Sequence, residues 1–166
     1  MPRSFDSPRI LILKSLIDPV RIEKSCEFYF RVNQKNEYIL NCVKRILIAN
    51  PNLIFFGDNL SNVALQEFSM RQITVICNTS ESIMKAISLS TNASILNSIE
   101  EIPFVQLGTC DSFKFETITS TSTKYSLLIL DKCPLPCYFS VILRNLTSRQ
   151  ESTIKQILQY AIFGCF

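Results

Sequence analysis

The apolar and polar residues in the first part of the chain follow two periods in turn, which predicts alternating strands and helices. Residues 10–13 form a short apolar run behind Pro8, the signature of a buried strand, and residues 53–56 predict a second strand. From Asn33 onward the apolar residues recur at spacings of three and four, which is typical of an amphipathic helix. Asn50-Pro51 ends that helix, whose predicted buried stripe is Ile39, Cys42, Val43, Ile46 and Leu47.

The same alternation continues as far as residue 103. A shorter helix is predicted around residues 60–68, then a strand at 73–77 and a helix behind Ser80, whose hydroxyl can accept from a free amide of the first turn. That helix is expected to turn three apolar side chains inward: Ile83, Met84 and Ile87. A brief strand at 94–96 precedes a turn that contains Glu100, Glu101 and Pro103. Because the connections are short, this order favours parallel βαβ units.

The C-terminal third predicts a run of strands closed by a helix. Phe113 and Phe115 share one face of a half-buried strand, and residues 126–130 read as a strand covered on both sides. Residues 131–136 must turn because they carry two prolines, so residues 138–143 are expected to return as a third strand. The last helix starts at Thr147 or Ser148 and gathers its apolar residues on one side: Ile154, Ile157, Leu158, Ala161 and Ile162. Together the two parts predict an α/β core with an antiparallel β addition.

Composition limits the chain to one ordinary globular domain. Its 166 residues are 47% apolar and 19% charged, which excludes extensive disorder. The net charge of +3 comes from interspersed residues, so no basic face for nucleic acid is expected. No apolar run reaches the ~18 residues that span a bilayer, and the N-terminus lacks a signal peptide. We therefore expect a cytoplasmic protein without direct membrane insertion.

The residue types exclude several kinds of chemistry. The chain has no histidine, so it cannot supply a Ser-His-Asp or Cys-His catalytic group, and it has no glycine-rich phosphate loop. Its seven cysteines are scattered; the one close pair, Cys133 and Cys137, lacks a second pair at zinc-ligand spacing and is interpreted as a rigid corner of structural thiols. No catalytic, cofactor-binding or metal-binding residue is therefore predicted.

Three acidic residues remain as weak candidates for a site. Asp58 follows the strand at 53–56, at the edge where open α/β sheets bind ligands, but a turn with a helix cap is the favoured explanation of Gly57-Asp58-Asn59. Asp111 and Asp131 flank a strand pair and are expected to approach each other, but nothing in the pattern directs both at a substrate.

The order of short motifs resembles the apical domain of group II chaperonins. It is more similar still to the chaperonin-like domain of the FYVE-finger phosphatidylinositol 3-phosphate 5-kinases, notably at Leu107–Phe113 and Gln159–Gly164. Further segments carry the likeness to the chaperonins: Pro8–Leu13, Ile46–Ile54, Asn59–Phe68 and the strand ending in Leu143-Arg144. The departures include Asn145-Leu146 where ring subunits have Gly-Gly, and Gly57-Asp58 where they have Glu-Lys.

The resemblance implies one chaperonin apical-like domain over residues 1–166, with a swivelling β/α/β core of parallel strands and helices and an added antiparallel β segment. The interval from residue 16 to 33 is too short for a full helical protrusion, so a reduced equivalent is expected there. The last helix ends with its apolar side still running, which we interpret as a truncation, and a fragment of a larger protein is expected. The ATPase and kinase regions of the related proteins have no counterpart in this sequence.

Three functions follow as hypotheses. The first is a non-catalytic interaction module that docks the scaffold and the lipid phosphatase of an endosomal lipid-kinase complex, peripheral on endosomal or vacuolar membranes through those partners. The second is a diverged client-binding apical domain of a cytosolic chaperonin, which would bind unfolded proteins. The third, weaker one is a small-molecule-binding α/β enzyme acting near Asp58. For either kind of protein partner, the candidate binding residues are Phe28, Tyr29, Phe30, Leu60, Asn62, Leu65 and Gln66; completion of the core explains the three aromatic rings at least as well.

Overall fold

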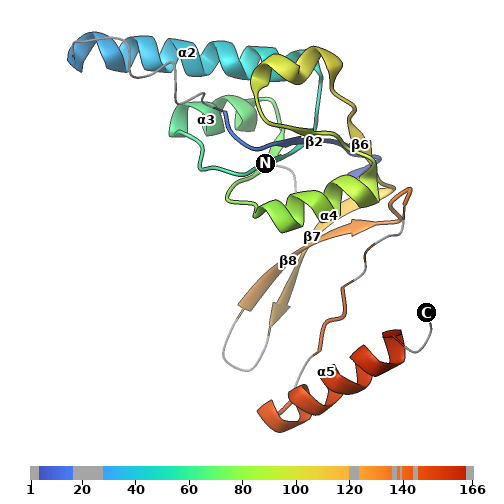
Figure 1. Cartoon of the computed structure of the whole chain (residues 1–166). Coiled ribbons are helices and arrows are strands. Elements are labelled where there is room, and N and C mark those ends of the chain that lie inside the picture. Colours follow the sequence, from blue (N-terminus) through green and yellow to red (C-terminus); the bar gives the residue numbers. More distant parts are fainter. Residues whose placement is uncertain are drawn as a thin grey trace.

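The strands of the protein form two sheets, one mostly parallel and one antiparallel. The computed structural model describes residues 4–16, 28–119, 124–135, 138, 140–143 and 146–163 (Figure 1). The mostly parallel sheet has the order β4-β3-β2-β5, and β6 pairs with β2 in the antiparallel sense. Its strands are β2 (Arg9–Leu13), β3 (Leu53–Phe56), β4 (Thr74–Ile76), β5 (Ile95–Leu96) and β6 (Gly108–Thr109). The predicted strands in the first part of the chain are thus confirmed, as are their parallel connections.

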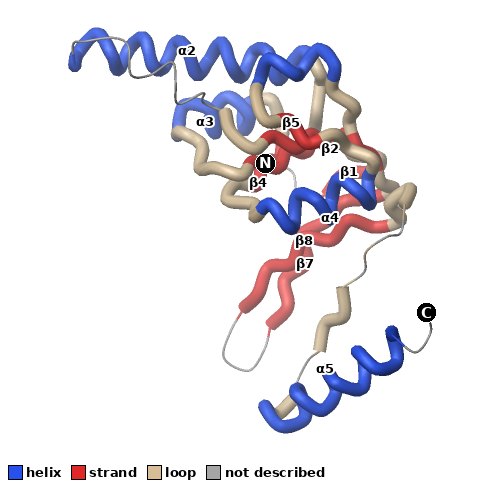
Figure 2. The backbone as a smooth tube through the Cα atoms, viewed as in Figure 1, coloured by secondary structure: helices blue, strands red, loops and turns tan. Residues whose placement is uncertain are grey.

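Three α-helices and a 3₁₀ helix cover the two faces of this sheet. They are α2 (Phe28–Ile48), α3 (Asn62–Met70), α4 (Glu81–Thr91) and the 3₁₀ helix η1 (Ile99–Phe104). Figure 2 shows α2 and α3 on one side of the sheet and α4 on the other. The turn predicted around residues 100–103 is therefore a 3₁₀ helix, whose first turn is capped by the Ser98 hydroxyl.

The central strand β2 supplies apolar side chains to both faces. Leu11 and Leu13 lie in a core cluster with residues of α2, α3 and η1, whereas Ile10 and Ile12 lie in a second cluster with α4 and Phe113. These four apolar side chains are fully buried. Successive residues of a strand point to opposite faces, so an unbroken apolar run is what a strand covered on both sides requires.

Two aromatic side chains of the first cluster pack against each other. Phe56 on β3 and Phe68 on α3 are fully buried, with ring centroids 6.1 Å apart. Burying such a side chain contributes roughly 1.5–3 kcal/mol by area alone. The contact fixes α3 against the sheet and leaves the opposite side of this short helix facing outward.

Two helical predictions need correction. Helix α2 begins at Phe28 and not at Asn33, because a helix held by the packed stripe from Ile39 to Ile46 is extended at little cost through residues that show no helical period themselves. On α4, Met84 and Ile87 are buried, but Ile83 is 53% exposed. One residue corresponds to 100° of rotation, which takes Ile83 off the buried face.

The antiparallel sheet has the order β1-β7-β8 and carries a long hairpin. Its strands are β1 (Ser4–Asp6), β7 (Ser112–Thr119) and β8 (Lys124–Asp131), and Phe113 lies opposite Leu130. Phe113 is fully buried, whereas Phe115 is 39% exposed and rests edge-on against it. Residues 127–130 are only half-buried, so the expected cover on both sides is absent. Phe113 belongs to the second core cluster, and the rest of the β7–β8 hairpin extends away from the core (Figure 1).

The segment after the hairpin departs from the sequence-based expectation. Tyr138 and residues 140–143 form no strand, and Tyr138, Val141 and Ile142 are about half exposed. β-propensity acts through packing against neighbouring strands, and an apolar segment without such a neighbour does not form a strand by itself. The last helix, α5 (Ser148–Phe163), is confirmed; it starts with a reciprocal cap in which Thr147 and Gln150 bond each other's backbone amides.

Candidate partner-binding surface

The outward side of α3 carries three of the seven candidate residues. The Ser61 hydroxyl caps the helix by accepting from the Ala64 amide at 3.3 Å. Ala64 and Phe68 turn inward, and the helical period then turns Asn62 and Gln66 toward solvent, with Leu65 half-buried. We call the set Asn62, Leu65 and Gln66 the α3 face. It is a rigidly held, mostly polar surface with one aliphatic side chain.

The other four candidates lie elsewhere. Leu60 is half-buried and packs against the first core cluster, so it belongs to the margin of the core. Phe28, Tyr29 and Phe30 form the start of α2, and their side chains lie outside the described residues. α2 packs along α3, but its first turns project beyond α3 in Figure 1. The seven residues therefore occupy separate places on the two helices.

Sequence reasoning missed the most exposed apolar residues on this side of the molecule. Phe104 at the end of η1 is 90% exposed, Ile48 at the end of α2 is 80% exposed and Met70 at the end of α3 is 71% exposed. η1 packs against α2, so two of these residues end neighbouring elements. The one sequence signal for Phe104 is its place behind Pro103, in a turn where a large apolar residue has no strand or helix stripe to join.

The carboxyl edge of the parallel sheet is closed by bonds between its loops. Gly57 lies so close to β2 that a Cβ there would come within 2.6 Å of the Lys14 carbonyl oxygen. Asn78 donates its side-chain amide to Asn59 Oδ1 at 2.8 Å, which joins the loops that follow β4 and β3. Asp58 beside them is exposed. The predicted turn is present, but the cap of the next helix is Ser61.

The acidic side chain in the first turn of α4, at this edge, is paired with two lysines. Glu81 in the first turn pairs with Lys14 at 3.5 Å and with Lys85 at 3.4 Å, and Lys85 followed by Lys14 lowers the pKa of the Glu81 carboxyl. An acidic side chain is favourable at a helix N-terminus. The Thr79 hydroxyl is buried and has no hydrogen-bond partner among the described residues. This edge therefore provides structural contacts around Asp58, and the residues described there form no convergent set of reactive groups.

The base of the β7–β8 hairpin brings Asp111 next to Lys132. The Asp111 amide donates to the Asp131 carbonyl oxygen at 3.1 Å, and the Asp111 carboxylate pairs with Lys132 at 3.4 Å. The expected approach of Asp111 and Asp131 is thus a backbone contact, and the Asp111 side chain is paired with a cation. Both aspartates are exposed. No pair of carboxylates converges on a substrate here.

Two cysteines lie beside this ion pair and are poor nucleophiles. Burial, followed by the neighbouring Cys133 and Asp111, raises the pKa of the Cys110 thiol to about 12. Burial also raises the pKa of the Cys133 thiol, with Asp131 adding to the effect. Protonated thiols react slowly, since the thiolate is the nucleophile. Cys137, the other half of the predicted corner, lies outside the described residues, and the described residues contain no group of three ligands for a metal.

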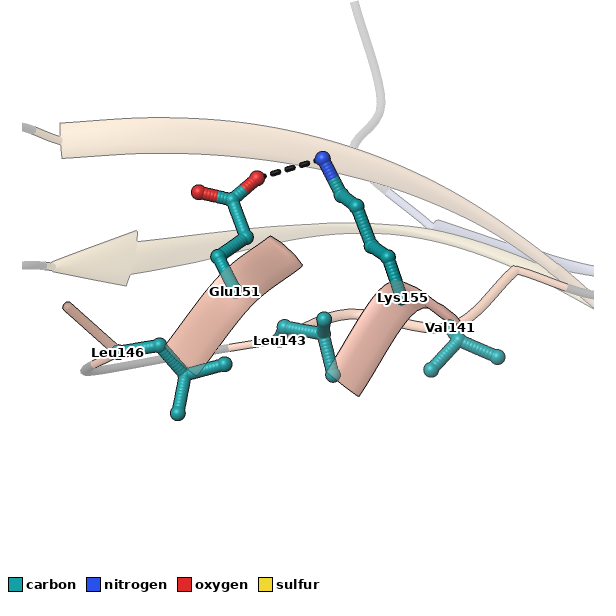
Figure 3. A pocket seen from close by; sticks show the side chains of 5 residues that line it. All are labelled: Val141, Leu143, Leu146, Glu151 and Lys155. Atoms are coloured by element: carbon teal, nitrogen blue, oxygen red, sulfur yellow. Dashed lines mark hydrogen bonds and ion pairs between the residues drawn. The ribbon is translucent and has the colours of Figure 1, made fainter. Parts of the chain in front are cut away.

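A hollow of about 320 Å³ lies between α5 and the segment that leads into it. Its walls are three aliphatic side chains and one ion pair: Val141, Leu143, Leu146, Glu151 and Lys155 (Figure 3). Figure 3 shows the ion pair on one side and the aliphatic residues along the incoming segment. The hollow is formed where α5 packs against Val141, Leu143 and Leu146, which precede it in the chain. None of the predicted candidate residues lines it.

The chain belongs to the TCP-1/cpn60 chaperonin family, whose sequence model matches residues 1–164. The fold agrees: the structure titled open state monomer of a group II chaperonin, from Methanococcoides burtonii, superimposes with a TM-score of 0.75. That match covers 98% of this chain and 35% of the other chain at 16% identity. The chaperonin-like α/β fold expected from the motifs is therefore confirmed.

The similar curated proteins are lipid kinases. The chain is 24% identical to 1-phosphatidylinositol-3-phosphate 5-kinase FAB1A of Arabidopsis thaliana and 23% identical to the FAB1 kinase of Saccharomyces cerevisiae, in both cases over 100% of its length. The corresponding human kinase is 25% identical over 98% of the chain. The chain spans only 10%, 7% and 8% of these relatives. None of the helices in the described part of the chain is both long and apolar enough to cross a bilayer.

Proposed function

We propose that the chain is a non-catalytic protein-interaction module that corresponds to the chaperonin-like region of phosphatidylinositol 3-phosphate 5-kinases. The observation that carries the proposal is the match of nearly the whole chain to one small region of several such kinases. As in the first hypothesis, the partners are the scaffold and the lipid phosphatase of the kinase complex. Location on endosomal or vacuolar membranes would then follow from those partners.

The α3 face is the surface we assign to this docking. α3 is held by its buried Phe68 and capped by Ser61, so its outward residues are presented without much conformational freedom. A rigid surface binds more tightly because little entropy is lost on association. Met70 at the end of the helix is 71% exposed and adds a flexible apolar contact at the margin of this face.

The test uses purified scaffold and purified phosphatase, each titrated against the chain. We expect Gln66→Arg combined with Asn62→Arg to weaken binding at least tenfold. A matched control is Gln156→Arg, at an exposed position of α5, which should leave binding unchanged. Binding that is equally tight in both variants would move the site away from α3, and no binding of the unmodified chain to either partner would remove the proposal.

The second candidate is a diverged client-binding domain, which the likeness to a group II chaperonin favours. A light-scattering assay with a thermally unfolding client protein distinguishes the two. A client-binding domain suppresses aggregation at stoichiometric concentration, whereas a dedicated docking module does not. For an enzyme acting near Asp58 there is no supporting observation, since the loops around that residue are joined to each other.

A further inference from the structure

The register of the hairpin brings together two cysteines that are far apart in the sequence. The β7–β8 ladder ends at the pair Ser112 and Asp131. The two segments remain adjacent beyond this pair, because the Asp111 amide donates to the Asp131 carbonyl oxygen and the Asp111 carboxylate pairs with Lys132. The next residues outward are Cys110 and Cys133. Cys110 and Cys133 therefore flank the joined residues Asp111 and Lys132 directly, and a disulfide can bridge two cysteines whose Cα atoms are roughly 4.4–6.8 Å apart.

The two thiols are neighbours in the same apolar cluster. Cys110 is a buried member of the cluster around Phe113, and Cys133 packs against that cluster and is half-exposed. Their electrostatic influence on each other agrees with this placement, since Cys133 raises the pKa of Cys110. The Cys110 thiol itself donates to the Ser112 carbonyl oxygen at 3.3 Å. Both are free cysteines in the structure. One thiol is thus accessible to a reagent and the other lies behind it.

We propose that Cys110 and Cys133 form a reversible disulfide when a small disulfide oxidant such as oxidised glutathione reaches Cys133. The Cys133 thiolate attacks one sulfur of the oxidant, forms a mixed disulfide and releases one glutathione thiolate. The Cys110 thiol then loses its proton and attacks the Cys133 sulfur, which releases the second glutathione. Two thiols of the chain are oxidised, one oxidant molecule is reduced by two electrons, and the two protons go to the released thiolates.

The position of the bond gives it a structural consequence. Leu135, two residues after Cys133, donates its amide to the Ser90 carbonyl oxygen of α4 at 3.1 Å. A disulfide at Cys133 would link the segment after β8 to Cys110 before β7. The same segment is already bonded to α4 through Leu135. The oxidised chain therefore holds the base of the hairpin more firmly than the reduced chain. Reaction is slow at neutral pH because both thiols are protonated there, and it accelerates as pH rises.

The experiment exposes the whole chain to excess oxidised glutathione at about pH 8.5, near the ordinary pKa of a thiol. Remaining thiols are then blocked, and the disulfides are located by peptide mapping under non-reducing conditions. We expect one intramolecular disulfide that joins the peptides of Cys110 and Cys133 and that dithiothreitol reverses. This measurement needs no variant, so a folding defect in a cysteine variant cannot hide the answer.

Single cysteine variants show which thiol reacts first with oxidised glutathione and which one then closes the disulfide. Cys110→Ser should stop the reaction at a glutathione adduct on Cys133, and Cys133→Ser should remove the disulfide and leave the buried Cys110 at least tenfold less reactive. The matched control is Cys77→Ser, at a half-exposed cysteine outside this cluster, which should oxidise like the unmodified chain. A map that joins Cys133 to Cys137, or one that finds both Cys110 and Cys133 still reduced, would overturn the proposal.

Discussion

The parallel core and the C-terminal part contain similar amounts of apolar sequence but differ in how that sequence is covered. Every residue of β3 is buried, since helices lie on both sides of the sheet. In β8 the equally apolar residues 127–130 are only half-buried, and on α5 Ile157 is 59% exposed. Short βαβ connections bring a covering helix to each core strand, whereas the hairpin and α5 have few neighbours. Uncovered apolar surface of this kind marks the part of the molecule where association is expected.

Removing one aromatic side chain from each part tests whether the two parts are packed differently. Phe56→Ala removes a fully buried ring that contacts Phe68, and we expect it to lower the free energy of unfolding by about 3–5 kcal/mol. Phe115→Ala, at a ring that is 39% exposed, should lower it by less than about half as much, because part of that ring is already in water. Urea unfolding monitored by circular dichroism measures both. Equal losses would mean that the hairpin is as well packed as the core.

A second prediction concerns the close approach of Gly57 to β2. Gly57→Ala places a methyl group 2.6 Å from the Lys14 carbonyl oxygen and should destabilise the core by roughly 1–3 kcal/mol, the range for inserting a group into a packed site. Asp58→Ala next to it removes an exposed side chain and should change stability little. The same unfolding assay compares the two neighbours, and a neutral Gly57→Ala would show that the β2 and β3 loops separate easily.

The third prediction is a pH dependence that originates at the base of the hairpin. The pKa of Cys110 is about 12 in the folded chain, against 9.0 for an ordinary thiol, so above pH 9 the unfolded chain loses a proton that the folded chain keeps. Stability therefore falls as pH rises from about 9 toward 12, by on the order of 1 kcal/mol per unit. Below pH 9 this contribution is fully present. Cys110→Ser should flatten the slope in unfolding experiments between pH 8.5 and about 10.5, and an unchanged slope would assign it to other groups.

The smallest expected effect on stability belongs to α5. Ile157→Glu changes an exposed residue and should alter the free energy of unfolding by no more than about 0.5 kcal/mol. The same change should reduce concentration-dependent association, which sedimentation velocity measures, because it interrupts the uncovered apolar side of the helix. Gln156→Glu is the matched control with the same added charge. Association that persists in Ile157→Glu would place the contact elsewhere, with Phe104 and Ile48 as the next residues to change.

Much of the core could be predicted from the sequence because its periodicity and its short connections agree. Residues 10–13 are apolar without interruption, and their strand is covered on both sides. Residues 126–130 have the same apolar pattern, but residues 127–130 are only half-buried. Residues 138–143 have a high β-propensity, but Tyr138 and residues 140–143 pair with no strand. An apolar run reports what a segment can bury; the neighbours that bury it come from the rest of the fold.

The candidate site shows the same limit. Spacing in the sequence singled out Cys133 and Cys137, whereas in the fold Cys133 packs against the apolar cluster that contains Cys110. The α3 face could be identified from the helical period, since Ala64 and Phe68 determine which side turns inward. The exposure of Phe104 was not predictable, because a turn has no periodic pattern that would distinguish its buried residues from its exposed ones.

Because the side chains of β2 are divided between two core clusters, the two helical layers are coupled in unfolding. Leu11 and Leu13 belong to the cluster of α2 and α3, and Ile10 and Ile12 to that of α4 and Phe113. Neither helical layer can detach without exposing one side of the same strand, so both layers and the base of the hairpin should unfold as one cooperative unit. Hydrogen exchange would then show a single slow class of amides across β2, β3 and the start of β7, while the end of β7, the start of β8 and α5 exchange independently and far faster.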